Sequence, residues 1–182
     1  MAGLSKRGGR AAGLAAMLLL TASAAAWAQT DTLELAVKAA YLYKLAPFVT
    51  WPADVSEPAQ PLTICVQGAD PFGPLLDRIV AGQSLAGRPV TVRRVSRLDP
   101  ATDCAIAYVA GSATQSQAQA LAAVERTPVL TVTDAARGQT RGIVHLLLDG
   151  GKVRFAIDAA KAHEAGVEIS SKLLALAVVV RP

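Results

Sequence analysis

Hydrophobic residues recur along residues 33–46 at intervals of three and four, which predicts a helix with one apolar face. The recurring positions are Val37, Ala40, Tyr41, Leu45 and, just beyond the helix, Phe48. Pro47 removes a backbone donor, so we expect this helix to end or kink just before it.

Short apolar runs rich in β-branched residues predict four strands, over residues 62–66, 89–95, 105–109 and 129–132. Helices are expected between them. The first is predicted to start at Asp70-Pro71, with Asp70 as N-cap and proline at the first helical position. The spacing of Ser112 and Gln115 is that of a capping box, which predicts another helix running to about residue 125.

The last third of the chain predicts a β-hairpin, with strands over residues 143–148 and 153–157 joined by a turn at Gly150-Gly151. Ser170 or Ser171 is expected to cap a closing helix through residues 173–177. Strands that alternate with helices before a hairpin indicate a single α/β domain. We expect a central mixed, largely parallel sheet flanked by helices, with the hairpin appended.

The N-terminus has the layout of a secretory signal peptide. Lys6, Arg7 and Arg10 precede an uncharged Ala/Leu-rich run over residues 11–25, and Ala26-Trp27-Ala28 supplies small residues for cleavage before Gln29. The alternative is an uncleaved membrane anchor, but the run is shorter than the roughly 18–20 residues that a span needs. We therefore predict a signal peptide over residues 1–28, one domain over residues 29–182, and an exported product.

Removal of the leader changes the charge of the chain. The full sequence has a net charge of +4, and three of its cations lie in the leader, so the remainder is close to neutral at +1. A net charge so close to zero does not favour a nucleic-acid partner. The remaining chain has about 150 residues, enough for one domain that buries roughly 68–70% of its unfolded surface.

The chain contains two cysteines, Cys65 and Cys104. In an oxidising compartment an even pair predicts one structural disulfide. The alternative is two separately buried thiols, because both residues fall in apolar segments. A redox-active pair is disfavoured, since there is no Cys-x-x-Cys spacing.

Motifs for catalysis and metal binding are missing from the sequence. His145 interrupts an apolar strand and His163 lies on a polar helix, and both are expected to be structural or solvated. There is no Gly-x-Ser-x-Gly or His-Glu-x-x-His motif and no His/Cys cluster at metal spacing. We therefore predict a protein that is not an enzyme and has no cofactor and no metal.

Two patterns indicate binding. Asp70, Ser112 and Asp134 each follow a predicted parallel strand, where the ligand crevice of an open α/β sheet lies. They are candidate ligand-binding residues, and the alternative is that they are ordinary turns and caps. Tyr43 and Trp51 are candidate partner anchors, although Trp51 can equally cap the core end of the helix.

Several blocks of this sequence resemble the YfiR-like periplasmic family. They occur in order across nearly the whole chain after the leader. The two most specific blocks are Tyr-Leu-Tyr at residues 41–43 with Trp-Pro at 51–52, and Ile-Ser-Ser-Lys-Leu-Leu at 169–174. Weaker matches cover residues 64–66, 70–73, 129–134 and 165–167.

The resemblance implies an exported α/β protein without catalytic activity that binds the periplasmic domain of an inner-membrane diguanylate cyclase. Binding restrains cyclic-di-GMP synthesis and biofilm formation; dimers are common, and in some members redox state tunes the restraint. We expect the partner contacts at residues 43–51, at Asp158 and at Ser170, Ser171 and Lys172. The alternative function is a small-ligand-binding protein that uses the strand-end crevice.

The chain departs from the family pattern at three positions, Pro47, His145 and Asp158, and it lacks the second cysteine pair that some members carry. Redox switching that depends on such a pair is therefore not expected here.

Overall fold

The structure is a computed structural model that describes residues 32–52 and 60–182. The predicted signal peptide therefore lies outside the described residues. The fold described below is that of the compact unit formed by residues 35–182. No helix within the described ranges is both long enough and apolar enough to span a bilayer.

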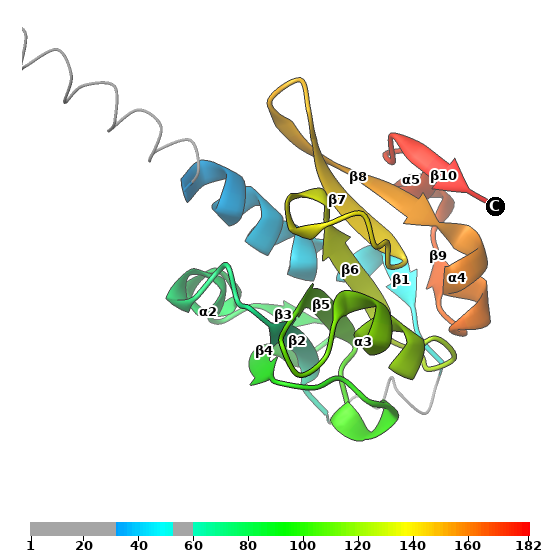
Figure 1. Ribbon diagram of the computed structural model, residues 1–182. Helices are drawn as coiled ribbons and strands as arrows, with labels where there is room; N and C mark the ends of the chain where they lie inside the picture. The colour runs from blue at the N-terminus through cyan, green and yellow to red at the C-terminus, as the bar shows by residue number, and fades with distance from the viewer. Residues whose placement is uncertain (1–31, 53–59) are drawn as a thin grey trace, which may run out of the picture. The chain divides into compact units, whose positions relative to one another are not determined.

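A mixed eight-stranded sheet forms the centre of this unit, as Figure 1 shows. Five neighbouring strands, from β7 to β4, are mutually parallel, and β8 joins β7 as an antiparallel hairpin. The predicted α/β class, the largely parallel sheet and the appended hairpin are confirmed. In spatial order the strands are β10 (Val179–Arg181), β8 (Lys152–Asp158), β7 (Val144–Asp149), β6 (Leu130–Asp134), β5 (Ile106–Gly111), β2 (Leu62–Gly68), β4 (Arg88–Val95) and β3 (Ser84–Leu85).

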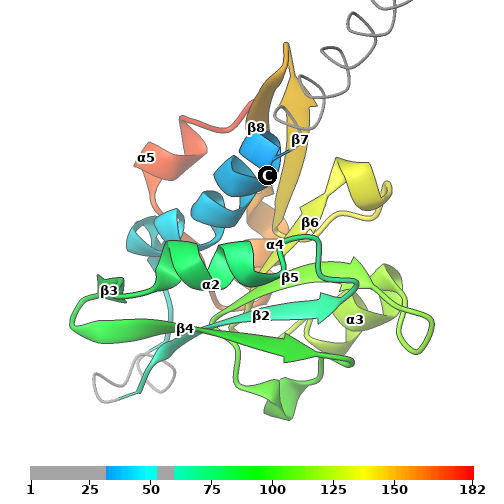
Figure 2. The same ribbon diagram turned by 90° about the vertical axis from the view of Figure 1, so that its left-hand side faces the viewer.

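Helices cover both faces of the sheet. Figures 1 and 2 show residues 35–44 of the first helix and α2 (Pro74–Val80) on one face, with α3 (Gln117–Ala123) on the other. The first helix ends before Pro47, as predicted, and a 3-10 turn over Ala46–Phe48 follows it.

The alternation of side chains along the strands divides the core into two clusters. In β2, Ile64 and Val66 join the large cluster under the first helix and α2. Cys65 lies between them in sequence and joins a smaller cluster with Ala120 and Val124 at α3. We call the sheet face that carries this smaller cluster the disulfide face.

Two predicted helix starts are wrong. Helix α2 begins at Pro74 with Gly73 as its N-cap, because the Asp70 carboxylate accepts from the backbone N–H of Phe72 at 2.7 Å and closes a turn instead. Such local side-chain bonds compete with helix formation.

The capping box before α3 consists of Ser116 and Gln119, not Ser112 and Gln115. The side chain of Gln115 points into the core, where it accepts from the backbone N–H of Leu98 at 2.7 Å. It is therefore not available to cap a helix.

The C-terminal region differs most from expectation. Of the two candidate caps, Ser170 is the N-cap, and α5 is a single turn, Ser171–Leu174. Residues 175–177, over which the helix was expected to continue, are not helical, and the strand β10 follows them. The short strands β1 (Val49–Thr50) and β9 (Glu168–Ile169) were not predicted, and α4 (Ala159–Glu164) is the polar helix on which the sequence placed His163.

Candidate partner-binding surface

A two-stranded ladder joins the two most specific sequence blocks. Strand β1 pairs antiparallel with β9, with Val49 opposite Ile169 and Thr50 opposite Glu168. The backbone N–H of Ser170 extends the contact by donating to the Phe48 carbonyl at 2.9 Å. Segments 43–51 and 158–172, in which the sequence placed the partner contacts, therefore lie side by side.

The aromatic candidates in the first segment are both associated with the core. Trp51 is 8% exposed and donates its indole N–H to the carbonyl of Ala105 at 3.2 Å. Of the two alternatives for Trp51, the structure has the core position, because its ring belongs to the large hydrophobic cluster. Tyr43 is partly buried and packs against the same cluster.

Two of the polar candidates in the second segment are helix caps. The Asp158 carboxylate accepts from the backbone N–H of Lys161 at 3.0 Å, and the Ser170 hydroxyl accepts from that of Leu173 at 3.3 Å. Ser171 and Lys172 are exposed on α5. These two side chains are therefore the ones that a partner can reach most directly.

Exposed aliphatic residues follow α5, and sequence reasoning missed them. Leu176 is 62% exposed, and the three valines Val178–Val180 are also exposed. We call these four residues the C-terminal apolar surface. The run of valines is typical of a strand, but its position at the open edge of the sheet depends on the topology. The four residues fall within five positions of the chain, and exposed apolar surface of this kind can mark an interaction site.

A groove of about 340 Å³ lies next to the β1–β9 ladder. Its walls come from α4, β9 and α5, and they include Ala162, His163, Ile169 and Leu174. We call it the α4–β9 groove. Its wall is partly apolar and partly polar, with His163 and Glu168 among the polar residues, and such a wall can receive an amphipathic side chain.

A buried ion pair fixes the first helix on the sheet. The Lys38 ammonium lies 2.6 Å from Asp134 Oδ2, and both side chains are no more than 5% exposed. Tyr108 donates its hydroxyl to the same carboxylate oxygen at 3.4 Å. Burial raises the pKa of Tyr108, and the charge of Asp134 adds to the effect. Asp134 Oδ1 accepts from the backbone N–H of Ala136 at 2.9 Å. Both carboxylate oxygens of this ligand candidate therefore bind groups of the same chain.

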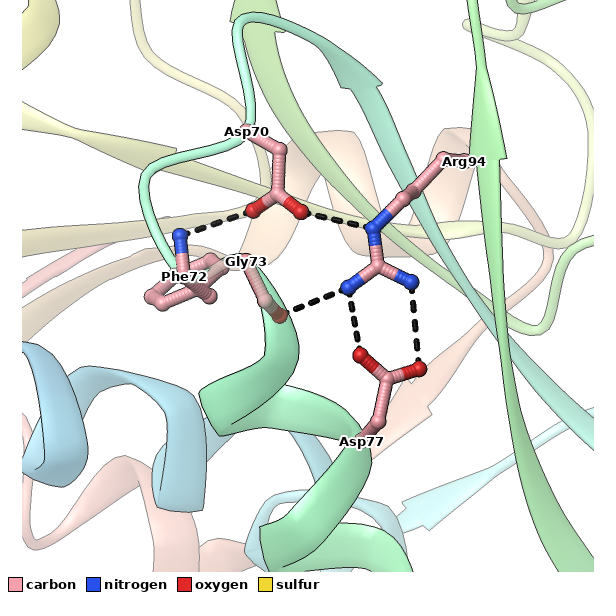
Figure 3. A network of polar contacts seen from close by, with 5 residues as sticks. All are labelled: Asp70, Phe72, Gly73, Asp77 and Arg94. Carbon is pink, nitrogen blue, oxygen red and sulfur yellow. Dashed lines mark hydrogen bonds and ion pairs between the residues drawn. The ribbon is translucent and has the colours of Figure 1, made fainter.

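Asp70, the second ligand candidate, belongs to the polar network in Figure 3. Arg94 on β4 contacts Asp70 Oδ2 at 2.7 Å and Asp77 Oδ2 at 2.6 Å, and it donates to the Gly73 carbonyl at 2.7 Å. Its hydrogen bond lowers the pKa of Asp77. The network ties β4 to the turn before α2. Because the pairs are exposed, each contributes little free energy of unfolding.

Ser112, the third candidate, accepts from the backbone N–H of Gln115 at 3.2 Å and contacts the Thr114 hydroxyl at 3.0 Å. All three candidates thus make their contacts within the chain. Asp70 closes a turn and pairs with Arg94, Ser112 closes a turn, and Asp134 pairs with Lys38. None of the three lines the α4–β9 groove.

The predicted disulfide is present. Cys65 on β2 is bonded to Cys104, with a Cα–Cα distance of 5.8 Å, and both residues are buried. Arg93 lies over the bridge, with its Nη2 atom 3.9 Å and 4.0 Å from the two sulfurs, and it donates to the Asp103 carbonyl at 2.9 Å. The bridge ties β2 to the segment that enters β5.

His145 is buried on β7, where its Nδ1 atom lies 2.9 Å from the Thr133 hydroxyl. Burial lowers its pKa, and Arg141 lowers it further. In residues 32–52 and 60–182 no three His, Cys, Asp or Glu side chains form a group that can hold a metal ion.

The family model described as YfiR/HmsC-like matches residues 35–178, a range that includes both strands of the β1–β9 ladder and the disulfide. The chain belongs to the YfiR/HmsC-like family. None of the curated proteins matches the chain. YfiR-like proteins are periplasmic regulators of diguanylate cyclases and not enzymes. The resemblance drawn from the sequence blocks is therefore confirmed at the level of the family.

Proposed function

We propose that this YfiR-like protein represses an inner-membrane diguanylate cyclase by binding the cyclase's periplasmic sensor domain. Repression lowers cyclic-di-GMP synthesis and with it biofilm formation. The observation that carries the proposal is the β1–β9 ladder, which brings the two family blocks together beside the α4–β9 groove. The partner-binding surface comprises this groove, the C-terminal apolar surface, and the side chains of Tyr43, Asp158, Ser170, Ser171 and Lys172.

The surface has the composition of a binding site. Leu176 and the valines of β10 expose apolar area, and its removal from water contributes about 25 cal/mol per Å². Ser171 and Lys172 supply a polar rim. Strand β10 ends the sheet, and an edge strand can add a strand of a partner by backbone hydrogen bonds.

Repression requires more than contact. A regulator shifts its receptor only by the difference between its affinities for the resting and the active conformation. Each 1.4 kcal/mol of that difference changes the ratio of resting to active receptor about tenfold. A single apolar side chain at the centre of the interface is therefore enough to release the cyclase when it is replaced by a charge.

The test compares two exposed leucines. Leu176→Glu puts a charge into the C-terminal apolar surface, and Leu148→Glu puts one on the β7–β8 hairpin, where Leu148 is 52% exposed. Each variant is expressed in a deletion strain, where cyclic-di-GMP and the amount of exported protein are measured. Binding of the purified protein to the sensor domain is measured in parallel.

We expect Leu176→Glu to weaken sensor-domain binding at least tenfold and to raise cyclic-di-GMP at normal protein levels. Leu148→Glu is expected to behave as wild type. A Leu176→Glu protein that binds and represses normally would contradict the proposed surface. A deletion strain with unchanged cyclic-di-GMP would contradict the function itself.

The proposal includes the exported location and the homodimer that the family resemblance implies. Mass spectrometry of periplasmic protein is expected to find a chain that starts at Gln29. Sedimentation of that protein is expected to give twice the mass of the processed chain. An unprocessed membrane-bound chain, or a monomer at micromolar concentration, would contradict these two parts separately.

A further inference from the structure

A second cavity lies on the disulfide face, and it shares helix α4 with the α4–β9 groove, through residues other than those that line the groove. It has a volume of about 270 Å³ and lies between α3 and α4, above the segments that enter β6 and β7. We call it the α3–α4 cavity. Ligand pockets in proteins usually measure roughly 300–1,000 Å³, so this one suits a small ligand.

The floor of the cavity is apolar. Val124, Val129 and Ile143 line it and are themselves buried, and Leu121 on α3 completes it. Val124 and Val129 also belong to the cluster that packs around the disulfide. The floor therefore packs against other buried side chains and against the disulfide. This packing keeps its apolar surface in place for an apolar group of a ligand.

Two cations border the cavity. Lys161 on α4 donates one N–H to the carbonyl of Arg141 at 2.7 Å, which positions its ammonium beside that residue and leaves two donors for a ligand. Among the residues that the structure describes, the Arg141 guanidinium has no hydrogen bond and no ion pair. Its fork of donors therefore stays free to bind a carboxylate.

One carboxylate, that of Glu125 in the turn after α3, also lines the cavity and is exposed. The lining thus combines two cations with one acid. A ligand with a single carboxylate can contact Lys161 and Arg141, whereas a second carboxylate on the same ligand would face either the apolar floor or Glu125. The cavity therefore favours a monoanion over a dianion.

We infer that the α3–α4 cavity binds a small aliphatic monocarboxylate, with its carboxylate between Arg141 and Lys161 and its hydrocarbon tail on the floor of Leu121, Val124, Val129 and Ile143. The charged hydrogen bonds fix the orientation of the ligand, and burial of the tail supplies affinity that grows with its length. Binding of this ligand does not require the proposed cyclase partner.

The test is calorimetric titration of the purified exported protein with octanoate. Three probes of similar length serve as comparisons: octylamine carries the opposite charge, octanol has none, and suberate has a carboxylate at each end. We expect saturable binding of octanoate at one site per chain. Each of the other three probes is expected to bind at least tenfold more weakly.

Two sets of variants locate the site. The double variant Arg141→Gln with Lys161→Gln is expected to weaken octanoate binding at least tenfold. Its matched control is Arg126→Gln, which removes an exposed cation beyond α3 that does not line the cavity. Ala122→Phe, which fills the cavity from an exposed position on α3, is expected to abolish binding, and Ala136→Phe, on an exposed turn outside the cavity, is not.

Thermal unfolding of each variant without ligand identifies those that fail to fold. No saturable binding of octanoate to the wild type would overturn the inference. Equal binding of octylamine, or unchanged octanoate affinity in folded Arg141→Gln/Lys161→Gln and Ala122→Phe proteins, would overturn it as well. None of these measurements involves the sensor domain, so the inference and the proposed function fail independently.

Discussion

His145 shows how one buried side chain makes stability depend on pH. The residue is 3% exposed, and burial is the main cause of its lowered pKa. Arg141 and Arg181 lower the pKa further, and Asp134 opposes them. In the unfolded chain the same histidine titrates near 6.5. The native state therefore binds fewer protons than the unfolded state at pH values just below 6.5.

The sign of the effect follows from that difference. Where the unfolded state binds more protons, the free energy of unfolding rises with pH. We expect the wild type to lose stability as the pH falls from 7 to 5, and His145→Gln, which cannot titrate, to lose less over the same range. Urea denaturation at pH 5, 6 and 7 measures both. Parallel pH profiles for the two proteins would contradict the assignment.

Single residues were also where sequence reasoning reached its limit. The sequence left Trp51 open between a core and a surface position, and only the packing of the first helix on the sheet decides it. The pairing of Lys38 with Asp134 cannot be predicted from spacing, because it depends on where a helix crosses the end of β6. Asp134 did follow a strand, as expected, but its contacts lie within the chain.

At the scale of elements, the contact between β2 and β5 depends on a glycine. The register between these strands shifts between Gln67 and Gly68. Gly68 has φ +84°, and a Cβ atom there would lie 2.2 Å from the carbonyl oxygen of Gly111. The close approach of two backbones, and not the turn alone, therefore requires glycine at this position.

A matched pair of variants separates the two requirements. Gly87 has φ +81° and open space where a Cβ atom would stand, so Gly87→Ala is destabilised only by its backbone conformation, by about 1–2 kcal/mol. Gly68→Ala adds a backbone clash, and overpacking typically costs a further 1–3 kcal/mol. We expect the lower melting temperature for Gly68→Ala in thermal unfolding followed by circular dichroism. Equal losses would show that β2 and β5 can separate freely.

Elements with long periodic patterns were predictable and short ones were not. The first helix and the strands β2, β4, β5, β6, β7 and β8 follow the hydrophobic pattern closely. The strands β1, β9 and β10 span only two or three residues, and tertiary contacts such as the β1–β9 ladder determine them. The predicted helix starts were wrong where the polar side chain binds a different backbone group. Asp70 accepts from the N–H of Phe72, and Gln115 accepts from the N–H of Leu98.

At the scale of the whole unit, the candidate surface depends on topology. Sequence blocks indicated segments 43–51 and 158–172, and the structure makes them neighbours through the β1–β9 ladder. Leu176 was expected to continue the closing helix. It is exposed because α5 ends at Leu174 and the chain turns into β10 at the edge of the sheet. No local pattern reports which strand forms an edge.

The disulfide constrains the unit as a whole, because it joins two segments separated by 39 residues. In the chain-entropy model a loop of this length stabilises the native state by up to about 4 kcal/mol, chiefly by restricting the unfolded chain. For a domain of this size each 1 kcal/mol corresponds to roughly 2–4 °C in melting temperature.

We expect the double variant Cys65→Ala/Cys104→Ala to fold and to melt up to roughly 16 °C lower. Reductant is expected to bring the wild type to the same melting temperature and to leave the double variant unchanged. A wild-type protein whose thiols are shown to be reduced, yet which melts as before, would mean that the packed disulfide face holds the sheet together without the bridge.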